Sequence, residues 1–194
     1  MIKLIVSLGN PDIQYKHTRH NIAWQFIECL PFHHELNWKN KFKGQYSFIS
    51  LHSKKLYLLK PLTYMNLSGE SVILTMDFFK IQPEELLIIH DELELPFGFI
   101  SLKNGGGLGG HNGLRSIESS IGTRDFKRMR LGISKPFHGN ITPYVLGGFS
   151  IEEKISLPSF LEKSAGILLK AVESEDFNNM TKKYRKYNTI PNIK

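Results

Sequence analysis

Residues 2–11 read IKLIVSLGNP, the pattern of a buried β-strand that ends in a turn. The first part of this stretch is apolar and rich in β-branched side chains, whereas its last three residues favour turns. A second apolar run, at residues 86–89, ends in the polar pair His90 and Asp91. The two runs predict two buried strands, each followed by polar residues.

The rest of the chain alternates between strand-like and helix-like segments. Further strands are predicted at residues 44–51, 55–59, 99–103 and 128–133, the first two forming a hairpin through a turn at His52, Ser53 and Lys54. Helices are predicted from about Asn21 to Pro31, from Ser68 as cap to Phe79, and from Gly113 to Ile121. A further helix is predicted to begin with a capping box at Ser150–Glu153 and to run to about Val172, with a break at Pro158. A last helix is predicted around Phe177, Met180 and Tyr184.

This order of elements predicts an α/β fold in a single domain that spans residues 1–194. We expect a mixed, mostly parallel twisted sheet with helices on both faces, followed by a basic C-terminal helix or tail at about residues 176–194. The length of 194 residues suits one domain.

Composition limits the possible settings and partners. Cys29 is the one cysteine, so an internal disulfide is impossible and a reducing compartment is expected. The sequence shows no signal peptide and no apolar stretch of transmembrane length, which favours a cytoplasmic protein. The net charge is +7, and basic residues gather after position 181, which fits a polyanionic partner or simply a solvated terminal helix: Lys182, Lys183, Arg185, Lys186 and Lys194.

Four polar clusters lie at or after the ends of predicted strands. They are Asn10 with Tyr15 and residues 18–21, residues 63–66, residues 90–92, and residues 105–113 with His111 and Asn112. Because ligands bind beyond the carboxyl ends of strands in open α/β sheets, the first and third clusters are expected to meet there.

Such a meeting would suit attack of water on an activated carbonyl such as an ester. A histidine can act as the general base, a carboxylate can orient it and favour its protonated form, and asparagine amides can support an oxyanion. This chemistry needs neither a metal nor a covalent nucleophile.

Each residue also has a purely structural interpretation. Asn10 suits a turn, His20 an exposed helix start, and Asp91 a turn cap, while Asn66 and Asn112 suit helix caps. His17 and His20 could bind a metal, but no matching pair completes a tetrahedral set, so no metal is expected. Residues 105–110 match a dinucleotide fingerprint, yet they lie far from the first strand and lack the acidic residue that should follow.

The polar clusters together resemble the motifs of the bacterial-type peptidyl-tRNA hydrolase family. The resemblance rests on LGNP at 8–11, Tyr15, TRHN at 18–21, KPLTYMNLSG at 60–69, HDELELP at 90–96, GGGLGGHNGL at 105–114, FKR at 126–128, Arg130 and GISKP at 132–136. Four residues depart from the family pattern and put local loop geometry in question: Ser7, Asp12, Ala23 and Glu94.

The resemblance implies a monomeric, cofactor-free and metal-free cytoplasmic esterase that hydrolyses peptidyl-tRNA and so recycles tRNA from peptides lost by the ribosome. It implies His20 as the base, Asp91 as its orienting partner and Asn10 as the residue that distinguishes a blocked from a free amine. It further implies substrate contacts by Tyr15, Tyr64, Met65, Asn66 and Asn112, a clamp for the tRNA 5′-phosphate at Lys103 and Arg130, and a basic C-terminal helix facing the acceptor stem.

Two other functions remain open at this level. The chain could be a non-catalytic RNA-binding relative of the same fold, although a pure binder has no need for a histidine–carboxylate pair. A nucleotide-dependent oxidoreductase would rest on the glycine-rich loop alone.

Overall fold

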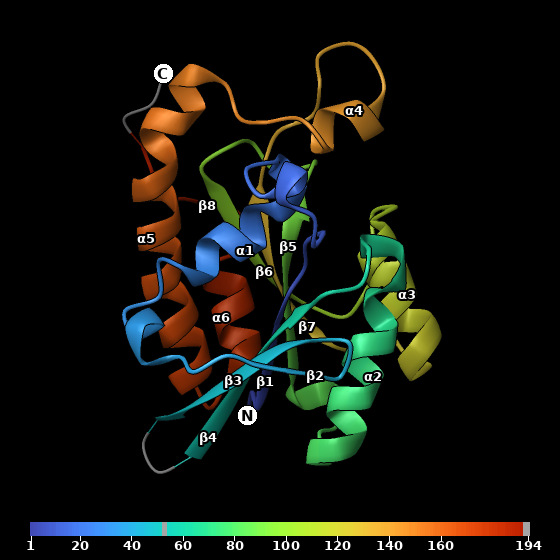
Figure 1. Cartoon of the computed structure of the whole chain (residues 1–194). Helices are drawn as coiled ribbons and strands as arrows, with labels where there is room; N and C mark the ends of the chain where they lie inside the picture. The colour runs from blue at the N-terminus through green and yellow to red at the C-terminus, as the bar shows by residue number, and fades with distance from the viewer. Residues whose placement is uncertain (52–53, 192–194) are drawn as a thin grey trace.

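A computed structural model describes residues 1–51 and 54–191 of the chain, which form one mixed sheet with helices on both faces (Figure 1). The strands are β1 (Leu4–Ser7), β2 (Lys39–Lys41), β3 (Gly44–Leu51), β4 (Lys54–Pro61), β5 (Leu86–Glu92), β6 (Phe99–Asn104), β7 (Lys127–Gly132) and β8 (Tyr187–Asn188). The α-helices are α1 (Ile22–Ile27), α2 (Ser68–Phe79), α3 (Asn112–Ile121), α4 (Ile141–Val145), α5 (Ile151–Glu173) and α6 (Phe177–Lys183).

Parallel pairing is confined to the centre of the sheet. The strand order is β2-β3-β4-β1-β5-β7-β6-β8, and β4, β1, β5 and β7 run parallel to their neighbours in this group. The strands on both sides of this group pair antiparallel. The α/β fold class with a mixed sheet is therefore confirmed, and its parallel part carries the predicted buried strands β1 and β5.

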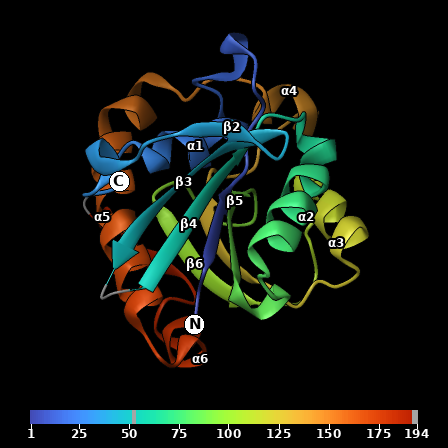
Figure 2. The same cartoon turned by 60° about the horizontal axis from the view of Figure 1, so that its bottom comes forward.

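Alternate residues of the central strands enter two different cores. On β1, Leu4 and Val6 pack with α2 and α3, whereas Ile5 packs on the opposite face with α1 and α5. Figure 2 shows α2 and α3 on one side of the sheet and α5 and α6 on the other. This two-sided burial explains why the sequences of β1 and β5 are almost continuously apolar.

The predicted break at Pro158 is wrong, because α5 continues through it. Proline removes the hydrogen bond to the carbonyl four residues earlier, here that of Lys154. Lys154 and Pro158 lie on the exposed side of α5, where water can satisfy that carbonyl, while Leu157 and Phe160 anchor the buried side to the core.

Several predicted element ends also differ. Ser68 does not cap α2, because its hydroxyl donates to the carbonyl of Met65 at 2.9 Å and Ser68 is itself helical. The first helix ends at Ile27, before Pro31, and Tyr184 follows α6 instead of lying in it. Of the predicted hairpin turn, His52 and Ser53 lie outside the described residues. The short elements β2, α4 and β8 were not predicted.

Candidate active site

The first and third polar clusters meet beyond the carboxyl ends of β1 and β5. Asn10 follows β1, Asp91 lies near the end of β5, and His20 lies in a 3-10 turn, Arg19–Asn21, that leads into α1. These residues border a cavity of about 430 Å³, which is also lined by Ile141, Thr142 and Val145 of α4. Its other walls come from the second and fourth clusters, including Tyr64, Met65, Asn66, Leu108, His111 and Asn112.

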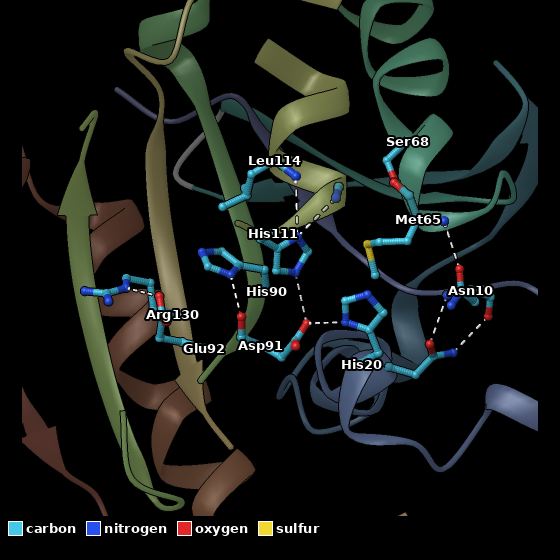
Figure 3. A network of polar contacts seen from close by, with 12 residues as sticks. Asn10, His20, Met65, Ser68, His90, Asp91, Glu92, His111, Leu114 and Arg130 are labelled. Atoms are coloured by element: carbon cyan, nitrogen blue, oxygen red, sulfur yellow. Dashed lines mark hydrogen bonds and ion pairs between the residues drawn. The ribbon is translucent and has the colours of Figure 1, made fainter. Parts of the chain in front are cut away.

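Two histidines converge on the buried carboxylate of Asp91 (Figure 3). Nδ1 of His20 lies 2.9 Å from Oδ1 of Asp91, and Nε2 of His111 lies 3.0 Å from the same oxygen. Nδ1 of His111 accepts the backbone N–H groups of Gly113 and Leu114, which fixes the proton of neutral His111 on Nε2. His111 therefore donates to Asp91 and caps α3 at the same time.

The electrostatics of the pair suit a general base. Burial opposes protonation of His20, but the charge of Asp91 and its hydrogen bond outweigh burial and raise the pKa of His20 above its ordinary value. Burial would raise the pKa of Asp91, but the two histidines lower it well below its usual range. Asp91 thus stays ionised, accepts the Nδ1 proton of His20 and leaves Nε2 of His20 able to take a proton.

His90 lies beside this pair but is a structural residue. It is buried, donates from Nδ1 to the carbonyl of Asp91 at 2.7 Å and packs edge-on against His111. Burial and the nearby His111 hold the pKa of His90 well below its ordinary value. A neutral His90 therefore fixes the end of β5 without adding charge to the cavity.

Asn10 is held rigidly at the wall of the cavity. Its backbone N–H donates to the side chain of Asn21, and the amide of Asn21 donates to the carbonyl of Asn10, each at 2.9 Å. Its Oδ1 accepts the backbone N–H of Met65 at 2.8 Å, so the first cluster is tied to the second (Figure 3). This bond leaves the Nδ2 donor of Asn10 for a ligand carbonyl.

The remaining residues of the predicted pocket differ in position. Tyr64, Met65, Asn66 and Asn112 line the cavity, whereas Tyr15 is not among its lining residues. The Tyr64 hydroxyl donates to Asp12, one of the departures from the family pattern, at 2.8 Å. The Asp12 carboxylate thus orients the side chain of Tyr64.

Lys103 and Arg130 lie in a second cleft, of about 560 Å³. Its other wall belongs to the C-terminal segment: Asn178, Thr181, Lys182 and Arg185. Burial and the positive charges of Arg128 and Arg130 lower the pKa of Lys103. Nε of Arg130 lies 2.8 Å from the carboxylate of Glu92, and Glu92 lines the active-site cavity. The Glu92 carboxylate therefore lies between the cavity and the second cleft.

Three side chains of the polar clusters organise this site, although no role could be assigned to them from the sequence. His111 orients Asp91, Asn21 holds Asn10, and Arg19 fixes the turn that carries His20. Asn21 and Arg19 flank His20 in the TRHN motif, which was the available signal, whereas nothing in the glycine-rich loop indicates that His111 faces Asp91.

One group of side chains could hold a metal ion. Ligand atoms of His20, Asp91 and His111 lie within 4.8 Å of one another. Nδ1 of His20 and Nε2 of His111 both bond to Asp91, so an ion bound to these nitrogens would replace the hydrogen bonds that orient His20. Metal independence stays a prediction.

Comparisons with known proteins agree over most of the chain. A family model described as peptidyl-tRNA hydrolase matches residues 4–192. A peptidyl-tRNA hydrolase from Listeria welshimeri is 44% identical over 165 residues, 84% of this chain and 90% of the relative. One from Shouchella clausii is 46% identical over 175 residues, 89% and 92% of the two chains. A crystal structure of peptidyl-tRNA hydrolase from Acinetobacter baumannii superposes with a TM-score of 0.79 at 38% identity, covering 93% of this chain and 94% of that one.

Proposed function

This chain belongs to the peptidyl-tRNA hydrolase family, and from that membership and its site we propose that it hydrolyses the ester that links a peptide to tRNA. The observation that carries the chemistry is the pair of His20 and buried Asp91, 2.9 Å apart at the wall of a cavity. The products are a peptide carboxylate and a tRNA with a free 3′-terminal ribose, available again for translation.

The reaction begins with His20. Its Nε2 removes a proton from a water molecule as the oxygen attacks the carbonyl carbon of the ester, and Asp91 stabilises the imidazolium that forms. When the tetrahedral intermediate collapses, the bond to the ribose oxygen breaks and the imidazolium returns its proton to that oxygen. His20 is thereby regenerated.

The asparagines supply neutral donors for the substrate. The free Nδ2 of Asn10 can bind a peptide carbonyl, which a free aminoacyl group lacks, and this contact favours blocked substrates. Asn66 and Asn112 are exposed at the rim of the cavity, where they can bind the peptide and the 3′ end and support the developing oxyanion. Tyr64 and Met65 complete the wall, and Tyr15 would contact substrate only beyond the cavity.

We assign tRNA recognition to the second cleft. Lys103 and Arg130 suit the 5′-phosphate, since cations with several donors bind phosphate oxygens well. Lys182 and Arg185 would contact the backbone of the acceptor stem, which carries little sequence information and so permits many tRNAs.

We further infer that the chain works as a single domain and a monomer in the cytoplasm. All residues assigned to the chemistry come from one chain, and one cysteine suits a reducing compartment. Among the described residues, no helix is both long and apolar enough to span a bilayer.

The decisive experiment measures release of labelled N-acetyl-aminoacyl groups from tRNA, in chelator, beside unblocked aminoacyl-tRNA. We expect release from the blocked substrate only, and a loss of about 10²- to 10⁴-fold in kcat for His20→Ala. His138→Ala is the matched control, because His138 lies outside both clefts. Normal turnover by His20→Ala would refute the base assignment, and tRNA binding without hydrolysis would favour the non-catalytic RNA-binding alternative.

A further inference from the structure

Arg128 on β7 is a buried cation that the chemistry above does not use. Its side chain is 1% exposed, and no carboxylate in residues 1–51 and 54–191 forms an ion pair with it. Burying an unpaired charge is unfavourable unless strong hydrogen bonds compensate. Because no carboxylate pairs with this buried arginine, other hydrogen-bond acceptors must bind its guanidinium N–H groups.

The partner is the backbone of the glycine-rich loop that follows β6. Nη1 of Arg128 donates to the carbonyl of Gly107 at 2.9 Å, and Nη2 donates to the carbonyls of Gly105 and Gly106, the latter at 3.2 Å. Gly105 and Gly106 have φ of 58° and 80°, a left-handed conformation that favours glycine and lets successive carbonyls turn towards one guanidinium.

This loop leads directly to the active site. Leu108, Gly109 and Gly110 line the catalytic cavity, and the loop ends at His111 and Asn112. A segment rich in glycine has a large conformational entropy, so it holds a fixed shape only when it is tethered. The N–H of Gly105 ties the start of the loop to the carbonyl of Phe126, and a turn bond from the N–H of His111 to the carbonyl of Leu108 closes its end. Arg128 holds the stretch between them.

We propose that Arg128 is a positioning residue: its guanidinium holds three successive carbonyls of the loop 105–111, and thereby places His111 and Asn112 against Asp91 and the substrate. The assignment rests on the proposed hydrolysis for its kinetic consequences. The fork geometry matters, because a guanidinium presents five N–H donors in a rigid plane that span several carbonyls, whereas a lysine ammonium is a compact point charge on a flexible stem.

Arg128 has a second effect, which acts through its charge. In the β6–β7 ladder Lys103 pairs with Arg128, and Arg130 follows two residues later on the same face. Burial and the charge of Arg130 lower the pKa of Arg128 to about 10, so it remains protonated at neutral pH. The charge of Arg128 therefore adds to the positive electrostatic field that attracts a phosphate to Lys103 and Arg130, although Arg128 itself does not contact the phosphate.

Two substitutions separate the two effects. Arg128→Lys keeps the positive charge and loses the planar guanidinium donors, whereas Arg128→Met loses both the charge and the donors. Arg124→Lys and Arg124→Met are matched controls, since Arg124 is exposed in the turn before β7 and pairs with Glu118. Each variant is assayed on full peptidyl-tRNA and on an N-acetyl-aminoacyl ester of a short RNA without the 5′-phosphate, well below its own Tm.

We expect Arg128→Lys to lower kcat about ten- to hundredfold on both substrates, because the loop carrying Asn112 is misplaced, with KM changed less than about threefold. Arg128→Met should lower kcat equally and also raise KM for the full substrate only. Amide hydrogens of residues 105–111 should exchange faster in both variants and not in the Arg124 controls.

A folded Arg128→Lys protein with kcat within twofold of the unmodified enzyme and unchanged exchange in the loop would overturn the assignment. Failure of the proposed function is distinguishable, because the unmodified protein would then fail to hydrolyse the ester. Hydrogen exchange would still test the tether in that event.

Discussion

At the scale of single residues, the ionisation of His20 decides the pH range of the proposed reaction. In that proposal the neutral imidazole is the base, so kcat/KM should rise as the pH rises through the pKa of His20 in the free enzyme. Asp91 raises that pKa, whereas burial lowers it, and the charge of Asp91 prevails. The midpoint of the acid limb is therefore expected above the ordinary histidine value of about 6.5.

Asp91→Asn should move this midpoint below about 6.5, because the burial of His20 then acts without the opposing charge. It should also lower kcat about tenfold or more, since the imidazolium loses its stabilising partner. The measurement is the pH dependence of kcat/KM between roughly pH 5 and 9, with exposed Asp125→Asn as the control. An acid limb that stays in place would show that Asp91 does not set the protonation of His20.

The residue scale also shows what the sequence could reveal about the site. His20 and Asp91 could be paired because both follow apolar strands, and parallel strands bring their carboxyl ends to one edge. The contact of His111 with the same oxygen of Asp91 could not be predicted. It depends on the path of a loop whose shape is set by Arg128, a long-range partner.

At the scale of elements, Arg19 joins the turn of His20 to α4, which lines the cavity, and to the start of α5. Its Nη2 lies 2.7 Å from Glu153 at the start of α5, Nη1 donates to the carbonyl of Gly148, and its guanidinium lies 4.2 Å from the ring centre of Tyr144 on α4. The pair with Glu153 is mostly buried, with side chains 11% and 18% exposed, so solvent weakens it little.

Glu153→Gln should therefore destabilise the protein by about 1–2 kcal/mol, or roughly 2–8 °C in Tm for a domain of this size. The amide keeps an oxygen for the capping box but loses the charge that pairs with Arg19. Glu152→Gln is the control, because Glu152 lies on the same first turn of α5 and is exposed. Equal shifts in thermal unfolding for the two variants would mean that the helix start, and not Arg19, is responsible.

The elements that the sequence missed share a cause. β2, α4 and β8 are each five residues or fewer, too short for a periodic pattern to stand out. They exist through tertiary contacts: β8 pairs with β6, and Tyr144 of α4 donates to the carbonyl of Ile133. Pro158 was misjudged because local sequence cannot show that its neighbours are anchored in a core.

At the scale of the whole molecule, the C-terminal segment builds one wall of the cationic cleft. The carbonyl of Tyr184 accepts the N–H of Leu102, and Thr189 bonds through its N–H and hydroxyl to Gly98. Arg185 lies between these bonds in the chain and lines the same cleft as Lys103 and Arg130. The predicted basic tail is thus tied to the sheet up to β8, and two of its basic residues, Lys182 and Arg185, line the cleft.

Arg185→Ala should weaken tRNA binding and reduce the slope of log Kd against log salt by about one. The hydrolysis rate at saturating substrate should stay unchanged, because the cleft is separate from His20. Filter binding between roughly 50 and 200 mM salt measures the slope, and Lys154→Ala, an exposed lysine outside the cleft, is the control. The same slope for Arg185→Ala and the unmodified protein would exclude Arg185 as a phosphate contact.

The ends of the sheet have a consequence for behaviour at high concentration. The outermost strand on one side, β2, has three exposed residues, two of them lysines, and β8 on the other side is only two residues long. An outer strand with free N–H and C=O groups is a template on which further chains can polymerise, and short, like-charged strands suppress this. Replacing Lys39 and Lys41 by valine should therefore make the protein self-associate and form fibrillar aggregates.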